Sequence, residues 1–569
     1  MTPPVPPVAP VPPVASVLPV GDRALLVECA GSPEALALWR RLLAARPRGV
    51  VEPVVAARTV LVRVEEGGLD RVRRLLEAMV APGGGADDGA GAGVGAAGRP
   101  PDDDLAAAGR EVVLDTVYDG ADLATVADAL GSSVEALVAR HAATRWTSAF
   151  LGFAPGFAYL TAEDWPEVAR HDTPRTRVPA GSVAVAGPWS AVYPAPSPGG
   201  WQLLGRTSAA VWDVDRPVPA LLVPGTRVRF RACRADAVVP RGTVPSTTRV
   251  PPATPGPPVT RVPPPASPAG RARPCLEVLR TGPLCLVEDL GRRGHLASGV
   301  PTSGALDRRA AVAANRLVGN DRDRAVLEVL LGGLVVRALD DVVVAVAGAR
   351  APLALEVDGV VVRPVPGRPV LLPAGATLTL GTPEQGLRTY LAVRGGFDAP
   401  AVLGSRATDL LSGLGPPPVA AGDVLPVLPP PGAAVPAAAD DAAHDVPPGP
   451  DHLVRVVPGP RADWITPRAR ALLLSRPWVV TDRSNRVGLR LAGPVLDRAT
   501  TAELPSEGTV PGAVQVPPDG RPVVFLADHP VTGGYPVVAV VRDADLDALA
   551  QVRPCERLRF REVADPRPG

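Results

Sequence analysis

The sequence predicts an α+β protein that is mostly β and consists of several domains. The chain has 569 residues, enough for several domains that each bury a core. It contains 72 prolines and 58 glycines. From Phe150 to Phe230, short apolar runs alternate with Gly/Pro turns, which is typical of a β-barrel or β-sandwich. Residues 18–81 combine strand and helix patterns and predict a small α/β domain.

The periodicity of the small domain predicts its elements. Apolar runs at 24–27 and 60–64 predict strands. Between them, Ser32 and Pro33 predict a helix start, with serine as the N-cap and proline at the first helical position. A second amphipathic helix is predicted over 69–79.

Fewer elements can be placed along the rest of the chain. Two short helices are predicted within 122–142. A clear helix over 305–318 ends before Gly319, which suits a C-cap. Strands are predicted in the last segment at 478–481, 523–525 and 537–541.

Four segments of biased composition divide the chain. Residues 1–17 are rich in proline and predict a disordered tail. Residues 82–108 and 428–450 are rich in small residues or proline and predict linkers. The proline runs within 237–272 predict a semi-rigid spacer that separates two halves. The domains expected between these segments cover 18–81, 109–236, 273–427 and 451–562.

The composition excludes several classes of function. The net charge is +1, which does not favour binding to nucleic acid or a membrane surface. All 59 basic residues are arginines, so the chain cannot carry covalent biotin or a pyridoxal phosphate Schiff base. The cysteines lack the spacing of a disulfide framework or a zinc site, and no metal site is expected. No signal peptide or long apolar segment is evident, so we expect a cytoplasmic protein. The five cysteines are Cys29, Cys233, Cys275, Cys285 and Cys555.

Residues 150–207 contain the most informative motifs of the first half. They place aromatic side chains beside glycine and proline, which suits a shaped, partly apolar pocket. Arg175, Arg177 and Arg206 accompany them as candidate anion ligands, because arginine binds carboxylate or phosphate bidentately. The alternative is that these are ordinary surface arginines.

The second half offers a further polar motif at 288–295, which includes Arg292 together with carboxylates and a histidine. Ser303 follows shortly before the predicted helix. It either caps that helix or helps to hold an anion at the helix N-terminus, where free N–H groups and the helix dipole favour negative charge.

The last segment contains two polar clusters. Asp482 and Arg483 directly follow a predicted strand. Asp528 and Tyr535 flank a Thr-Gly-Gly turn, and such a group of acid, base and hydroxyl side chains is suited to proton transfer. The alternative for the second cluster is a hairpin loop.

The ordered motifs resemble two known families. Residues 18–236 resemble the B subunit of the bacterial ATP-dependent 5-oxoprolinase, also described as allophanate hydrolase subunit 1. Residues 274–562 resemble the C subunit, a family described as biotin-dependent carboxyltransferase or allophanate hydrolase subunit 2. The matching runs include Phe150–Leu160, Thr173–Gly187, Pro198–Thr207, Gly299–Asp307, Ala314–Asn320, Tyr390–Gly396 and Thr532–Pro536.

The resemblance implies a fold and an activity. It implies cyclophilin-like β-barrels, one in the first half after the small α/β domain and two in the second half. It also implies a natural B–C fusion that opens 5-oxo-L-proline to L-glutamate with ATP and Mg²⁺, acting with a separate A subunit. The catalytic residues expected on this basis are Asp482, Arg483, Asp528 and Tyr535. The expected ligands for substrate or phosphate are Arg175, Arg177, Arg206, Arg292 and Ser303.

Two alternatives stay open. The chain resembles a carboxyltransferase acting on a urea-like amide, which would need a biotin carrier in trans because no lysine is present. It also resembles a regulatory binding protein, since the same families include an inhibitor of a sporulation kinase and its antagonist. The run before the Thr-Gly-Gly turn departs from the usual family pattern, which puts a catalytic role of His529 in doubt.

Overall fold

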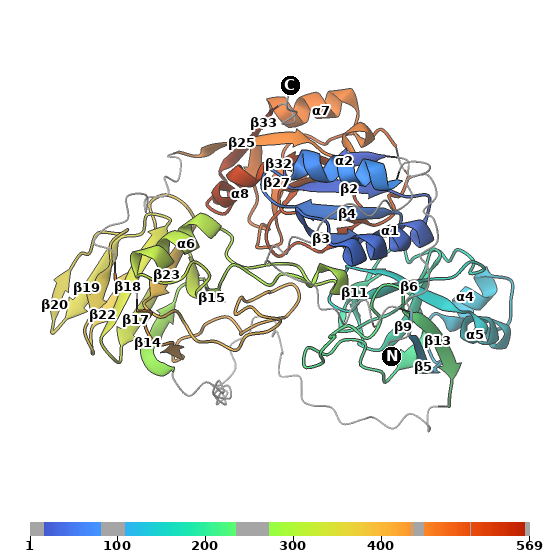
Figure 1. Ribbon diagram of the computed structural model, residues 1–569, viewed down its shortest axis with the longest axis horizontal. Coiled ribbons are helices and arrows are strands. Elements are labelled where there is room, and N and C mark those ends of the chain that lie inside the picture. The colour runs from blue at the N-terminus through green and yellow to red at the C-terminus, as the bar shows by residue number, and fades with distance from the viewer. Residues whose placement is uncertain are drawn as a thin grey trace.

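The computed structural model describes residues 16–80, 109–234, 272–432, 434–435, 449–500 and 502–563. The predicted tail at 1–17 and linkers at 82–108, 237–272 and 428–450 lie largely outside these residues. The chain forms three lobes, and its first and last domains lie together in one of them (Figure 1). The expectation of a mostly β protein with barrels in both halves is confirmed.

The small N-terminal domain is an antiparallel sheet of order β1-β2-β4-β3 covered by two helices. The predicted strands and helices are present, and β1 and β3 were not predicted. Gly31, not Ser32, occupies the N-cap of the first helix, and Pro33 lies in its first turn. The elements are β1 (Val17–Pro19), β2 (Ala24–Glu28), α1 (Ser32–Ala45), β3 (Val50–Val55), β4 (Thr59–Val64) and α2 (Leu69–Val80).

Both faces of this small sheet are buried. Leu25 belongs to a core shared with α1 and with aromatic residues of the second lobe. Leu26 and Leu61 point to the other face and share a core with Phe525 and Val540 near the C-terminal end of the chain. Because successive side chains of a strand alternate between faces, one strand contributes to two cores. The two halves therefore fold against each other.

The first half continues as a closed barrel of order β10-β7-β6-β13-β5-β12-β9. Helices α4 (Leu123–Ala129) and α5 (Val134–Ala143) lie before its second strand, as predicted, and Ser133 caps α5. The barrel strands are β5 (Glu111–Val117), β6 (Trp146–Leu151), β7 (Ala158–Thr161), β9 (Ser182–Ala186), β10 (Trp189–Val192), β12 (Gln202–Thr207) and β13 (Arg227–Ala232). A separate pair is formed by β8 (Arg175–Val178) and β11 (Ser197–Gly199).

The first domain of the second half differs in detail from the expected barrel. It consists of two open sheets, β20-β19-β22-β17-β14-β24 and β15-β16-β23-β18-β21. The two sheets share one apolar core, so they pack as a sandwich without closing by hydrogen bonds. The strands are β14 (Arg273–Thr281), β15 (Leu284–Glu288), β16 (Val326–Leu330), β17 (Leu334–Ala338), β18 (Val342–Gly348), β19 (Leu353–Val357), β20 (Val360–Val362), β21 (Val370–Leu372), β22 (Thr377–Leu380), β23 (Arg388–Val393) and β24 (Val424–Val427).

One helix of this domain, α6 (Arg308–Leu317), begins slightly later than predicted. Asp307 caps it, because its carboxylate accepts a hydrogen bond from the Ala310 N–H at 2.9 Å. Ser303 is therefore not the helix cap. It lies four residues upstream in a loop that is free to serve another purpose.

The last domain is a closed barrel of order β25-β32-β29-β30-β27-β26-β33. The three strands predicted there are present. The strands are β25 (Asp451–Pro458), β26 (Trp478–Val480), β27 (Gly488–Ala492), β29 (Ala513–Gln515), β30 (Val523–Phe525), β32 (Val537–Val541) and β33 (Arg557–Glu562). Helices α7 (Pro467–Ser475) and α8 (Asp543–Leu549) and the short pair β28 (Glu507–Gly508) and β31 (Thr532–Gly533) complete it. Within the described parts of the chain, no helix is long and apolar enough to span a membrane.

Candidate functional site

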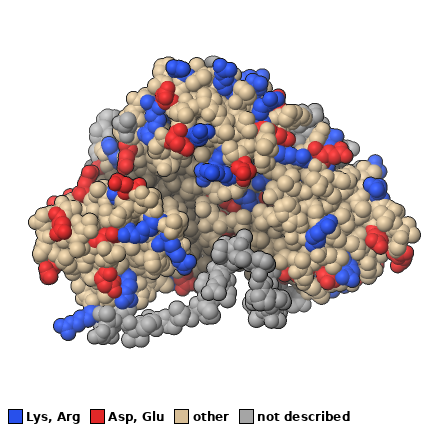
Figure 2. Space-filling view, turned by 180° about the vertical axis from the view of Figure 1, so that it is seen from behind, with Lys and Arg blue, Asp and Glu red and all other residues tan. Residues whose placement is uncertain are grey.

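A cavity of about 220 Å³ lies where the small N-terminal domain meets both domains of the second half. Four arginines and several acids line it, so its surface is mixed in charge. The polar residues that line it are Asp22, Arg23, Glu52 and Arg63 from the first half, and Arg293, Thr302, Ser303, Arg308, His529 and Asp543 from the second. On the face shown in Figure 2, arginines and carboxylates are interspersed, and the lobes meet around a hollow.

Arg63 on β4 reaches across the junction between the halves. Its Nη1 donates a hydrogen bond of 3.0 Å to Thr302 Oγ1. Burial lowers the pKa of this guanidinium, and the positive charges of Arg293 and Arg308 lower it further, although Glu52 opposes them. Arg293 and Arg308 thus place positive charge close to Arg63 at the cavity.

The acids at the cavity are already engaged by donors of the protein. Asp22 Oδ1 accepts from the Asp543 N–H at 3.1 Å, and Asp22 Oδ2 lies 3.2 Å from Arg542 Nε. Glu52 accepts the N–H groups of Gly294 and Leu296 at 3.2 and 2.7 Å. These acids therefore hold the loops around the cavity in place.

Arg308 is tied to the same framework. Its Nη2 lies 3.3 Å from Asp543 Oδ1, and its Nε lies 3.3 Å from Asp547 Oδ1. Arg293 extends from an exposed position. The cavity thus combines a fixed guanidinium at Arg308 with a more exposed one at Arg293.

Ser303 occupies an unusual backbone conformation at the edge of the cavity. Its φ is 53°, in the left-handed region that residues other than glycine rarely adopt. The loop is held by close backbone packing, since a Cβ added to Gly291 would lie 2.3 Å from Thr302 O. The Arg292 N–H also donates to Thr302 O at 2.8 Å. Such strain persists only where the surroundings enforce it, and it is concentrated at functional sites.

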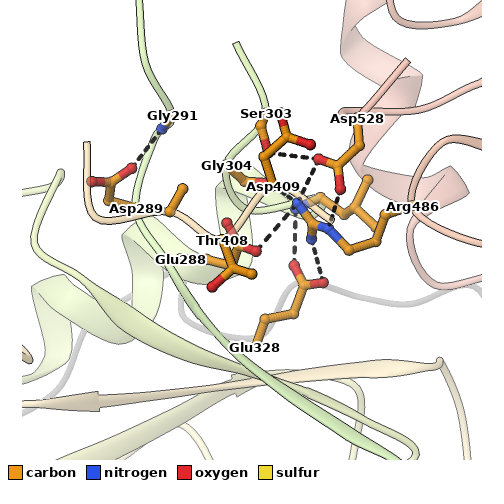
Figure 3. Close-up of polar contacts among 12 residues, drawn as sticks. Glu288, Asp289, Gly291, Ser303, Gly304, Glu328, Thr408, Asp409, Arg486 and Asp528 are labelled. Carbon is orange, nitrogen blue, oxygen red and sulfur yellow. Dashed lines mark hydrogen bonds and ion pairs between the residues drawn. The ribbon is translucent and has the colours of Figure 1, made fainter. Parts of the chain in front are cut away.

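Behind Ser303 lies a buried network centred on Arg486 (Figure 3). Ser303 Oγ donates to Asp528 Oδ1 at 2.6 Å. Arg486 holds the same carboxylate through Nε at 2.9 Å and Nη2 at 3.1 Å. Its Nη2 also donates to Gly304 O at 2.7 Å. The network therefore fixes both the hydroxyl group of Ser303 and the backbone beside it.

Two more carboxylates share the charge of Arg486. Glu328 Oε1 lies 2.6 Å from Nη1, and Glu288 Oε1 lies 3.3 Å from Nη2. Burial opposes the charged guanidinium, but Asp528, Glu288 and Glu328 together raise the pKa of Arg486 well above its ordinary value. The other oxygen of Glu328 accepts from the Tyr390 hydroxyl group at 2.7 Å and from the Leu306 N–H at 3.0 Å.

The carboxyl group of Glu288 is the least compensated of this cluster. It is fully buried, and its pKa is raised well above the ordinary value by burial and by the neighbouring Glu328 and Asp528, against the opposing charge of Arg486. Nearby, burial together with Asp528 raises the pKa of Asp409 to about 6. Burial and the neighbouring acids thus favour the protonated forms of both carboxyl groups.

His529 lines the cavity from the last domain of the chain. Its ring stacks on Phe525 with centroids 5.6 Å apart, and its Nδ1 lies 2.8 Å from Pro530 O. Burial, with a contribution from the charge of Arg63, lowers the pKa of this imidazole to about 4. His529 is therefore neutral at pH 7.

The three arginines predicted as ligands in the first half do not line this cavity. Arg175 Nη2 bonds Asp122 at 2.6 Å within its own lobe. Arg206 Nε bonds Asp119 at 2.9 Å and is half exposed, and Arg177 is exposed on β8. Their role as ligands stays a prediction.

Of the residues predicted in the second half, the structure brings only two together. Ser303 and Asp528 are brought into direct contact. Arg292 is buried elsewhere, where its Nη2 donates to Ala407 O at 2.5 Å and its Nη1 lies 3.9 Å from Asp409. The other three predicted residues, Asp482, Arg483 and Tyr535, are exposed and do not line the cavity.

Sequence reasoning missed Arg63, Glu328 and Arg486. Glu328 carries a signal in retrospect, because a single glutamate within the apolar run of β16 predicts a buried partner. Arg486 lies three positions after the predicted Arg483, and nothing local distinguishes the buried arginine from the exposed one. Arg63 looks like an ordinary polar position on an alternating strand.

The arrangement can bind a small anion and an amide at once. Guanidiniums donate hydrogen bonds to carboxylate or phosphate, and the fixed hydroxyl group of Ser303 offers a polar contact at the cavity edge. Among the described residues, no group of three or more His, Cys, Asp or Glu side chains is arranged to hold a metal ion.

Both halves match known domain families. Residues 15–222 match the family "carboxyltransferase domain, subdomain C and D", and residues 298–562 match "carboxyltransferase domain, subdomain A and B". The chain is 38% identical over 285 residues to the 5-oxoprolinase C subunit of Escherichia coli strain K12, which covers 49% of this chain and 87% of that protein. It is 45% identical over 125 residues to the 5-oxoprolinase B subunit of Escherichia coli O157:H7, which covers 21% of this chain and 57% of that protein.

A solved structure extends the similarity across both halves. The crystal structure of the protein TTHA0988 aligns with a TM-score of 0.76 and 35% identity, covering 95% of this chain and 99% of that one. The same succession of lobes therefore exists in another single polypeptide. The chain belongs to the carboxyltransferase-domain family, with a half similar to the 5-oxoprolinase B subunit followed by a half similar to the C subunit.

Proposed function

We propose that this chain is the fused B/C component of an ATP-dependent 5-oxoprolinase, which opens 5-oxo-L-proline to L-glutamate together with a separate A subunit. The observation that carries the proposal is the cavity built jointly by the two halves, with Arg63 from the first and Arg293 and Ser303 from the second. A site that needs both halves explains why relatives of each half bear the names of subunits of one enzyme.

The chemistry of the substrate fits the cavity. A lactam is a poor electrophile, and transfer of the γ-phosphoryl group of ATP to its carbonyl oxygen would give an imidate phosphate that water can attack. Arg63 and Arg293 would bind the substrate carboxylate and stabilise negative charge on the phosphoryl group during transfer. Water then adds to the activated carbon, and the ring C–N bond breaks to free the amine and leave an acyl phosphate. A second water hydrolyses that acyl phosphate to glutamate and inorganic phosphate.

Mg²⁺ would enter such a reaction with the nucleotide. Mg²⁺ usually binds one or two carboxylates together with substrate phosphates. The carboxylates at the cavity, Asp22 and Asp543, are held by arginines and backbone N–H groups. The described residues therefore offer no ready magnesium cage, and we assign no step to the metal.

The test is reconstitution. The full chain, a candidate A subunit, ATP, Mg²⁺ and 5-oxo-L-proline are mixed, and glutamate and phosphate are measured. We expect both products in equal amounts, and only when all components are present. If neither glutamate nor phosphate forms, the proposal is wrong.

A second candidate is a carboxyltransferase that acts on a urea-like amide. It is favoured by the description of both matched families as carboxyltransferase domains. Because the chain has no lysine, the biotin carrier would be another protein. Incubation of the full chain with a carboxybiotin-loaded carrier and urea separates the two candidates, because only a carboxyltransferase would discharge the carrier in the presence of urea.

A further inference from the structure

We propose that Ser303 is the hydrogen-bond acceptor for the N–H group of the substrate amide, and that it makes the cavity selective for a lactam over the corresponding lactone. The inference rests on the proposed function, because it takes the cavity as the site where 5-oxo-L-proline binds. It adds the residue that recognises the one donor group of the ring.

The proton of the Ser303 hydroxyl group is already committed. A serine hydroxyl has one proton to donate and two lone pairs to accept with. Ser303 Oγ donates its proton to Asp528 Oδ1 at 2.6 Å. Ser303 lines the cavity, and a bound molecule that reaches this oxygen would meet only its acceptor lone pairs.

This orientation is enforced by the surroundings. Asp528 is fully buried and held by two nitrogens of Arg486. Rotation of the hydroxyl group away from Asp528 would leave a buried carboxylate with one donor fewer, which is unfavourable. The main chain is fixed as well, since Gly304 O accepts from Arg486 and the Ala305 N–H donates to Asp289 O at 2.9 Å.

The other groups at the cavity have less free capacity to accept a substrate N–H. Guanidiniums only donate. Thr302 Oγ1 already accepts from Arg63, which occupies one of its two lone pairs. The carboxylates are occupied by the donors named above: Asp22 by Arg542 and a backbone N–H, Glu52 by two backbone N–H groups, and Asp543 by Arg308. His529 is the remaining rival, because its neutral imidazole has one nitrogen able to accept.

The lactone of the same acid isolates this contact. (S)-5-Oxotetrahydrofuran-2-carboxylate keeps the ring, the carbonyl group and the carboxylate of 5-oxo-L-proline, but it has a ring oxygen in place of the N–H. Next to Ser303 Oγ, the lone pairs of that ring oxygen would face the lone pairs of the serine oxygen, and no hydrogen bond would form. A site built around a hydrogen bond from its ligand rejects the analogue that lacks the donor.

The experiment is calorimetric titration of the full-length chain with both compounds. We expect the wild-type chain to bind the lactam at least about tenfold more tightly than the lactone. Ser303→Ala should reduce this ratio to less than about threefold, mainly by weakening lactam binding. Ser303→Gly should do the same and removes the strain of the positive φ, so it serves where the alanine variant folds poorly.

A matched control comes from Ser405, whose Oγ donates to Asp289 at 2.6 Å but which does not line the cavity. Ser405→Ala should leave the lactam-to-lactone ratio unchanged. The inference is overturned if both Ser303 variants keep the wild-type ratio of lactam to lactone affinity. It is also overturned if His529→Gln abolishes that ratio and the Ser303 variants do not. Wild-type binding of both compounds with equal affinity overturns the inference alone, whereas no binding of the lactam overturns the proposed function as well.

Discussion

Arg63 Nη1 lies 3.0 Å from Thr302 Oγ1, so a strand of the N-terminal domain is bonded to a loop of the second half that lies 239 residues further along the chain. The bond joins the guanidinium of Arg63 to the loop that carries Ser303. Neither half contains the whole site. The candidate site therefore lies at the junction between the halves.

Arg63→Met should impair substrate binding. Methionine keeps an unbranched apolar side chain but removes the charge and the bond to Thr302. A hydrogen bond to a charged group is worth about 1.5–3 kcal/mol, so we expect the Kd for 5-oxo-L-proline to rise about 10- to 100-fold. Calorimetric titration measures the effect. Arg41→Met is the control, since Arg41 bonds Met79 O in the same domain and does not line the cavity.

Arg486→Met should strongly destabilise the second half. It leaves the buried carboxylates Glu288, Glu328 and Asp528 without their common counter-charge. Removing one member of a buried ion pair costs about 3–5 kcal/mol, which corresponds to a fall of about 10 °C in the unfolding midpoint. Scanning calorimetry measures that midpoint.

The neighbouring Arg483 supplies the comparison for that experiment. It is exposed, so Arg483→Met should change stability by less than about 0.5 kcal/mol. Equal unfolding midpoints for the two variants would show that the network around Arg486 does not stabilise the fold.

These two arginines also show where sequence reasoning ends. The run from Thr481 to Gly488 offers two arginines after an apolar strand, and local pattern alone favoured Arg483. Arg486 is the buried one because Glu288 and Glu328 come from β15 and β16, far away in sequence. Ser303 and Asp528 could be selected because each lies beside a glycine-containing turn, but their 2.6 Å contact follows from the tertiary fold.

The fold shows the same division. The apolar run at 24–27 predicted a strand, and Leu25 and Leu26 do point to opposite faces of β2. The run is consistent with burial of both faces, but it could not reveal what covers the second one, because that cover comes from Phe525 and Val540 at the other end of the chain. Whether strands close into a barrel also depends on contacts between distant parts of the chain. Residues 273–427 form two open sheets where a barrel was expected.

His529 should make the chain sensitive to acid. Burial lowers the pKa of its imidazole from 6.5 to about 4. Between these pH values the unfolded state takes up a proton that the folded state does not, so stability falls as the pH drops. From pH 7 to pH 5 this group should cost about 2 kcal/mol. His529→Gln should lose correspondingly less stability in urea unfolding over that range, and identical losses would contradict the assignment.

Gly291→Ala should displace the loop of Ser303. The added Cβ would lie 2.3 Å from Thr302 O, and the glycine has a φ of 82°. Gly404 has a similar φ of 79° with nothing within 4 Å of an added Cβ, so Gly404→Ala introduces only the backbone strain. We expect Gly291→Ala to weaken binding of 5-oxo-L-proline at least about tenfold, because small displacements of a binding group are costly. Gly404→Ala should leave the Kd nearly unchanged, and equal effects would contradict this account.

The two halves should associate even when they are separate chains. Leu26 and Leu61 of the first half are buried against Phe525 and Val540 of the second, and separation would expose this apolar surface to water. Co-expressed fragments 1–236 and 273–569 should therefore elute together in gel filtration and bind 5-oxo-L-proline like the intact chain.

Leu61→Asp tests whether that apolar contact causes the association. Leu61 is fully buried, and it packs so closely on Gly508 that a Cβ added to that glycine would lie 2.6 Å from the Leu61 Cβ. A carboxylate at position 61 would therefore have no room for hydrating water. Burying an unpaired charge is strongly unfavourable, and the variant fragment should no longer elute with its partner. An exposed change in the same fragment, Arg177→Asp, should leave the complex intact. Wild-type fragments that elute separately would show that the halves need their covalent connection to form the cavity.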